Sequence, residues 1–176
     1  MWGATNVLVY HGSYKEIHEP NVTFGREALD FGLGFYVTTL QDQAEKWALR
    51  NLKKKDILIA KPIVNVYDFD NQGLLIKSFN GYSEDWFDFV CACRSKTAAQ
   101  QHHDATFGNM ADDDVATAVD DYMSQLRAGR ITPLAKLATL ELLSFSKPTD
   151  QFCIHKQSVA DSRLSFLHSY EVGVDT

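Results

Sequence analysis

Long hydrophobic runs are missing from this chain. No stretch of about 18 or more apolar residues occurs in its 176 residues, which excludes a transmembrane helix. Residues 1–6 have neither the positively charged start nor the apolar stretch of a secretory signal peptide. The sequence therefore predicts a soluble protein of the cytoplasm without a membrane partner.

Cysteine and basic residues are also scarce. The three cysteines are odd in number, and Cys91 and Cys93 lie too close together to bridge each other, so reduced thiols are expected. Lys and Arg total 17 against 23 acidic residues, a formal net charge of −6 that repels a phosphate backbone. The one basic run, residues 53–55, is interpreted as a solvated helix end.

The apolar residues that are present, 45% of the chain, are enough for one domain over residues 1–176. Strands are expected at 6–11, 34–38, 57–69, 74–76, 151–155 and 164–174, the last after a short helical turn. Helices are expected from a Thr39 cap to about residue 51, from a Ser83 cap, over 115–126, and from Pro133. Because strands and helices do not alternate regularly, the fold class is predicted to be α+β.

Several local features refine this prediction. Gly12 and Ser13 are expected to end the first strand and to leave His11 at its end, ahead of a long connection over 15–31. Pro62 indicates a bulge or an edge strand. In the helix that starts at Pro133, one side carries Leu134, Leu137, Ala138 and Glu141.

Three segments carry a family resemblance. They are residues 9–13 (Val-Tyr-His-Gly-Ser), residues 24–39, which contain Gly32-Leu33-Gly34-Phe35-Tyr36, and residues 147–155, which contain Asp150-Gln151. Together they resemble the ADP-ribosyltransferase superfamily, and more closely a bacterial family of small uncharacterised domains within it. The resemblance implies a split β-sheet core with flanking helices, NAD as the substrate, and no metal.

Carried over residue by residue, the resemblance implies a catalytic set of His11, Tyr36 and Gln151. The histidine would hold NAD by a donated hydrogen bond, the tyrosine would stack on nicotinamide, and the residue at 151 would engage the ribose. The implied NAD-binding residues are His11, Gly12, Ser13, Arg26, Gly34, Phe35 and Tyr36.

These residue types suit the chemistry that the resemblance implies. Cleavage of the bond between nicotinamide and ribose develops an oxocarbenium-like cation, and the site must hold the leaving base and the ribose hydroxyl. Gly32 and Gly34 would allow close approach to nicotinamide. Arg26 would pair with the pyrophosphate, or alternatively with Glu27 or Asp30 on the surface.

Gln151 departs from the superfamily pattern, which usually has glutamate there. A carboxylate ~4 Å from a developing cation contributes about 4 kcal/mol at an effective dielectric of ~20, which is roughly a thousandfold in rate. Asp150 or Glu141 would replace that charge if the fold brought either close. As neighbours on a strand, however, Asp150 and Gln151 are expected to face opposite ways.

The leading functional hypothesis is transfer of ADP-ribose to a macromolecular acceptor, with protein favoured over nucleic acid because the chain is acidic. The alternatives are NAD hydrolysis and an inactive module that binds NAD or a protein. The oligomeric state is not predicted.

Three other polar groups have simpler interpretations. His102-His103-Asp104 is interpreted as a solvated loop rather than a metal site. Cys153, two residues before His155, is interpreted as a core cysteine rather than a nucleophile. The acidic run 112–114 is expected to cap a helix.

Overall fold

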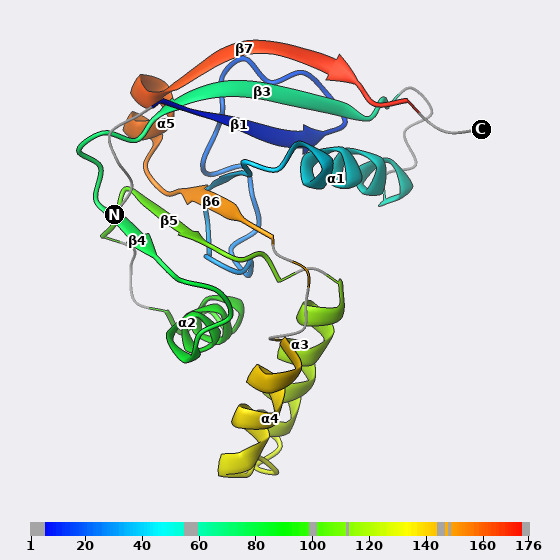
Figure 1. The fold of residues 1–176 in the computed structure, drawn as a ribbon, viewed down its shortest axis with the longest axis vertical. Coiled ribbons are helices and arrows are strands. Elements are labelled where there is room, and N and C mark those ends of the chain that lie inside the picture. The colour runs from blue at the N-terminus through cyan, green and yellow to red at the C-terminus, as the bar shows by residue number, and fades with distance from the viewer. Residues whose placement is uncertain are drawn as a thin grey trace.

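Two separate β-sheets organise the chain, as the computed structural model shows for residues 6–54, 60–98, 102–111, 113–143, 147 and 149–173 (Figure 1). The first sheet is antiparallel, with the order β1 (Asn6–Ser13), β3 (Ile63–Asp70), β7 (Leu164–Glu171). The second has the order β2 (Phe35–Val37), β6 (Gln151–Ile154), β5 (Ala105–Gly108), β4 (Ile76–Ser78), and only β4 and β5 run parallel. Together with five helices in the described ranges, these sheets confirm the α+β class.

The two sheets meet where β1 approaches β2. Tyr10 and Thr38 exchange two backbone hydrogen bonds there, 2.8 and 2.9 Å long. Behind this bridge, apolar side chains of both sheets fill one core, which includes Val9, Phe35, Tyr67, Phe152 and Ile154. The seam between the sheets therefore brings together segments of β1, β2 and β6 that are far apart in the sequence.

The helices cover the sheets at different places. Helix α1 (Gln41–Lys54) packs Ala44 and Ala48 against Val64 and Val66 of the first sheet. Helix α2 (Glu84–Arg94) lies against the second sheet, helix α5 (Gln157–Arg163) precedes β7, and helices α3 (Asp113–Arg127) and α4 (Pro133–Leu143) form a hairpin that extends away from both sheets (Figure 1).

Local signals account for some helix starts and not for others. Ser83 caps α2 as predicted, since its hydroxyl accepts the Trp86 N–H at 3.2 Å. The predicted Thr39 cap of α1 is wrong. The helix begins at Gln41, and Thr39 instead bonds to the Asp150 carboxylate through its N–H (2.8 Å) and its hydroxyl.

The strands differ from the prediction in four ways. β1 continues through Ser13, so His11 lies inside the strand and not at its end. Pro62 is neither in a bulge nor on an edge, because it precedes the central strand β3, and its carbonyl accepts the Val172 N–H. β4 lies at Ile76–Ser78 rather than 74–76, and β5 was not predicted. Residues 57–59 of the predicted third strand, and Val174 of the last, lie outside the described residues.

The predicted leucine side of α4 faces outward. Leu134 and Leu137 are 72% and 58% exposed, and Ala138 and Glu141 are exposed as well. Within the described ranges, none of the helices combines the length and the apolar character that crossing a bilayer requires.

Candidate functional site

His11 is held at the seam between the sheets. Its Nδ1 lies 2.7 Å from the Tyr36 backbone oxygen, and its ring stacks on Phe35 with 4.5 Å between centroids. Because a carbonyl only accepts, Nδ1 carries the proton. Burial lowers the pKa of His11, against the opposing effect of this hydrogen bond, so the imidazole is neutral at pH 7. Nε2 is therefore an acceptor in this tautomer, whereas the predicted hydrogen bond from His11 to NAD needs a donor. The role of His11 toward NAD stays a prediction.

Gly12 presents its peptide groups at the open edge of β1. The N–H and C=O of Tyr10 bond to Thr38 on the side of β1 away from β3. Gly12 is two positions further along the strand, so its N–H and C=O point to the same side. The Gly12 oxygen accepts the Asn51 side-chain amide at 3.2 Å. A Cβ on Gly12 would lie 2.1 Å from the Ala44 oxygen, so the glycine is required by the packing of α1. Ser13, which follows, is buried.

Tyr36 fixes the end of the long connection between β1 and β2. Its hydroxyl donates to the Gly32 oxygen (2.6 Å) and accepts the Phe31 N–H (3.1 Å). Burial first, and then the nearby Cys153 and Asp30, raise the pKa of Tyr36, so its hydroxyl stays protonated. The ring remains half-buried, and its orientation is set by the backbone that it holds.

Gly34 packs closely against β6. A Cβ there would lie 2.5 Å from the Cys153 Sγ and 2.6 Å from the Ile154 oxygen. The glycine therefore lets the chain approach β6, and its predicted approach to nicotinamide stays a prediction. Gly32 has a φ of +80°, which a glycine adopts without strain.

Gln151, the first residue of β6, is buried in a polar cluster. Its exposed fraction is 6%, and its Nε2 donates to the Asp30 carboxylate at 3.1 Å. Asp30 also pairs with Arg94, at 2.6 Å between Oδ1 and Nη2. The carboxylate beside Gln151 is therefore Asp30, and not Asp150 or Glu141.

The other candidate charges lie elsewhere. Asp150 faces Thr38 and Thr39, away from Gln151, which confirms that these neighbours point in opposite directions. Glu141 is exposed on α4. Arg26 is exposed, and its predicted alternative partners are taken, because Glu27 pairs with Lys96 and Asp30 pairs with Arg94.

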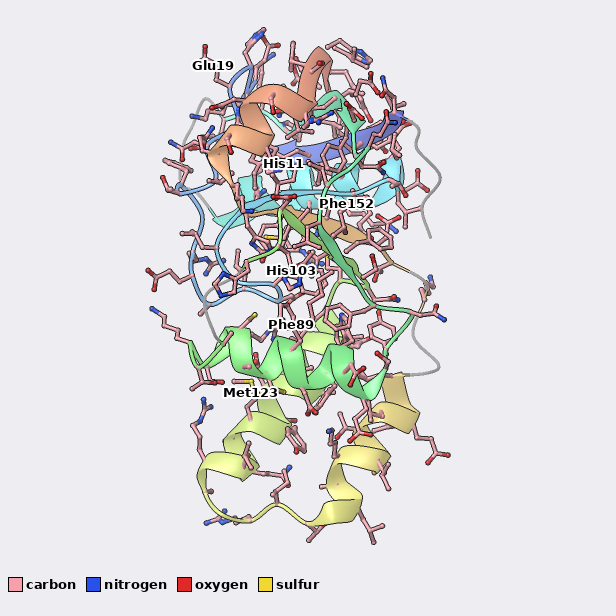
Figure 2. The ribbon with its side chains drawn as sticks, turned by 90° about the vertical axis from the view of Figure 1, so that its left-hand side faces the viewer. His11, Glu19, Phe89, His103, Met123 and Phe152 are labelled. Atoms are coloured by element: carbon pink, nitrogen blue, oxygen red, sulfur yellow. The ribbon has the colours of Figure 1, made fainter. Side chains whose placement is uncertain are left out.

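The fold places the three predicted catalytic residues on adjoining strands, but on two faces. Tyr36 lies opposite Cys153 on β6, and Gln151 is two residues before Cys153, so all three share the face toward α2. His11 contacts Phe35, which points to the opposite face, into the core between the sheets. In Figure 2 His11 lies above Phe152, and Phe89 of α2 lies below both. His11 therefore lies on one face of the second sheet, and Tyr36 and Gln151 lie on the other.

Asp30 and Arg94 are the site residues that sequence reasoning missed. Their separation of 64 residues leaves no local signal, and Asp30 was considered only as a partner of Arg26. Two surface cavities, of about 300 and 500 Å³, lie between α3 and α4 and between residues 18–21 and α5. Neither is lined by His11, Tyr36 or Gln151.

The remaining polar groups that the sequence singled out range from exposed to buried, and the Nδ1 of His103 has no hydrogen-bond partner among the described residues. Burial raises the pKa of the Cys153 thiol and its exposed fraction is 0%, which confirms a core cysteine. The Asp104 carboxylate binds the Leu75 N–H and Lys156. Within the described ranges, no three His, Cys, Asp or Glu side chains are grouped to hold a metal ion. Asp112, part of the predicted helix cap, lies outside the described residues.

Comparison with known proteins adds a family but no activity. No curated protein and no solved structure matches this chain. Residues 7–166, which include His11, Tyr36 and Gln151, match a family described as a protein of unknown function, DUF3990. The chain belongs to this family.

Proposed function

We propose that this chain binds NAD, cleaves its nicotinamide-ribose bond and transfers ADP-ribose to a macromolecular acceptor. The observation that supports this best is the His11–Tyr36 hydrogen bond of 2.7 Å, which holds a neutral imidazole at the seam of the two sheets. It leaves Nε2 able to accept a hydrogen bond from a sugar hydroxyl. An extended ligand with two riboses is long enough to contact residues on both faces of the sheet.

In this proposal the adenosine ribose lies at His11 and nicotinamide lies at the open edge of β1. The carboxamide has one donor group and one acceptor group, which match the C=O and N–H of Gly12. The C=O has two lone pairs, and one of them already accepts the Asn51 amide. The Tyr36 ring offers a face for the nicotinamide ring, and its hydroxyl is already engaged by Phe31 and Gly32. Because the tyrosine is held before ligand binds, little ordering is needed on binding.

The reaction breaks the bond between the nicotinamide nitrogen and the ribose carbon. The bond electrons leave with nicotinamide, which becomes neutral, and the ribose carbon accepts an electron pair from the acceptor, whose proton passes to solvent. Gln151 would supply an amide dipole near the developing cation, weaker than a full carboxylate. A slow enzyme is expected, and no metal takes part.

The net charge of the chain is the basis for the proposed class of acceptor. With a formal net charge of −6, the surface favours a protein acceptor over a nucleic acid. If water is the acceptor, the same site is an NAD glycohydrolase.

An inactive NAD-binding module is the second candidate, and the specific observation in its favour is that the Asp30 charge near Gln151 is already paired with Arg94.

Calorimetry with NAD and assays with labelled NAD test the proposal. His11→Ala and Tyr36→Ala should each weaken NAD binding at least about tenfold, since each removes one polar or stacking contact of about 1.4 kcal/mol or more. His168→Ala is the matched control, because His168 is exposed on β7 in the first sheet. It should bind NAD as the wild type does.

The products separate the alternatives. Labelled protein together with released nicotinamide supports transfer, whereas free ADP-ribose alone indicates hydrolysis. Tight binding without turnover indicates a binding module. If the wild type does not bind NAD at millimolar concentration, the proposed function is wrong.

A further inference from the structure

A buried polar cluster lies between β6 and α2, and its centre is the Asp30 carboxylate. Oδ1 accepts two N–H groups of Arg94, at 2.9 Å from Nε and 2.6 Å from Nη2. Oδ2 accepts the Ala111 N–H at 2.8 Å and the Gln151 amide at 3.1 Å. The side chains of Asp30 and Arg94 are only 9% and 14% exposed. All four partners of the carboxylate are donors, so each of its oxygens accepts two hydrogen bonds.

This carboxylate dictates how the Gln151 amide is turned. An ionised carboxylate only accepts, so the amide must direct Nε2 toward Asp30 and Oε1 away from it. In the part of the chain that the structure describes, no group donates to Oε1. The side chain therefore offers an oxygen with partial negative charge on the side away from Asp30.

We propose that Asp30 is a positioning residue that presents the oxygen of Gln151, and not its nitrogen, to the reacting ribose. This inference rests on the proposed function. An amide oxygen stabilises a developing cation, whereas an amide nitrogen carries partial positive charge and opposes it. Asp30 therefore acts on the rate of bond cleavage through Gln151 and does not touch NAD.

The same contact explains why residue 151 is an amide in this chain. A carboxylate at 151 would face the Asp30 carboxylate at about 3 Å, and two carboxylates at that distance do not both ionise. Exchanging the two groups, Asp30→Asn with Gln151→Glu, would keep one amide and one carboxylate in the pair. The Nδ2 of the new Asn side chain would donate to the carboxylate at 151, which would be free to ionise, and the Ala111 N–H would lose its acceptor.

Turnover of four variants tests this inference. Asp30→Asn should lower kcat about tenfold with NAD affinity little changed, because a ribose hydroxyl can bond to either end of the amide. Gln151→Glu should stay within about threefold of the wild type at pH 7. The kcat of the double variant should exceed that of the wild type at least tenfold. The upper limit is the roughly thousandfold effect of a carboxylate beside the developing cation. Asp120→Asn is the control: Asp120 bonds to Arg94 at 3.0 Å and is itself 67% exposed.

Urea unfolding at several pH values provides a readout that does not need turnover. In Gln151→Glu the pKa of the added carboxyl is raised in the folded state, so stability is lost as the pH rises above the unfolded value near 4.3. The unfolding constant should increase about tenfold for each pH unit until the folded pKa is passed. The double variant and Asp120→Asn should lack this added dependence.

Two results would overturn the inference. One is a gain in turnover from Gln151→Glu alone equal to that of the double variant. The other is an unfolding profile of Gln151→Glu that parallels the wild type at every pH. If the wild type neither binds nor cleaves NAD, the proposed function fails together with the role of the Gln151 oxygen, and the unfolding profiles still decide whether Asp30 governs the side chain at 151.

Discussion

Tyr36→Phe separates the two roles of Tyr36, in the fold and in the site. The change removes one oxygen and leaves the Phe31 N–H and the Gly32 C=O without their partner. A buried polar group left unpaired costs about 1–3 kcal/mol. Because the Tyr36 side chain is half-buried, water reaches part of this region, and a total loss of about 2–3 kcal/mol is expected.

Urea unfolding followed by circular dichroism measures this loss, and the slope of the unfolding free energy with urea should not change. Tyr170→Phe is the matched control. Its hydroxyl donates at 2.9 Å to Glu45, whose carboxylate is partly exposed and can bind water instead, so the expected cost is below about 1 kcal/mol. NAD affinity of Tyr36→Phe should remain within about threefold of the wild type, because the ring is kept. A cost below about 0.5 kcal/mol for Tyr36→Phe would refute the reasoning.

Three further predictions concern His11, Gly34 and Cys91. Burial lowers the pKa of His11 below 6.5, so the unfolded state binds its proton more tightly and stability falls as the pH drops below about 6.5. His11→Gln should remove up to ~1.4 kcal/mol per pH unit of that slope, as urea unfolding at several pH values measures. Gly34→Ala should lower the free energy of unfolding in urea by at least about 2 kcal/mol, because the added Cβ would lie 2.5 Å from an atom of β6. Gly173 has open space around it, so Gly173→Ala should change the free energy of unfolding by no more than about 0.5 kcal/mol. Burial raises the pKa of Cys91 to about 11, which lowers the fraction of reactive thiolate at pH 8. Iodoacetamide at pH 8 should therefore label Cys91 about a hundredfold more slowly in the folded protein than in guanidinium, and equal rates would contradict this.

The sequence predicted the elements that carry a strong local signal. The Ser83 cap, the proline that opens α4 and the regular apolar spacing in α3 all lie within a few residues, and their helices form as expected. β5 was missed because Ala105–Gly108 is short and mostly buried on both faces, so it has no polar alternation. Its existence depends on the flanking strands β4 and β6, which come from distant parts of the chain.

The same limit applies to the candidate site. The sequence motifs led to His11, Tyr36 and Gln151, which the fold carries on adjoining strands. The contact between Gln151 and Asp30 joins residues 121 positions apart, and no spacing rule predicts it. The tautomer of His11 likewise depends on a carbonyl 25 residues away. Long-range polar partners are set by tertiary packing, so only the structure reveals them.

The bridge between Tyr10 and Thr38 has a consequence for how ligand affinity is controlled. His11 belongs to one sheet, while Tyr36 and Gln151 belong to the other, so a small tilt of one sheet against the other changes the spacing of the groups that would grip a ligand. Substitutions in the shared apolar core, such as at Phe152, would therefore alter affinity without touching the ligand. Under the proposed function, substitutions at this seam would adjust the affinity for NAD while every residue that contacts it stays unchanged.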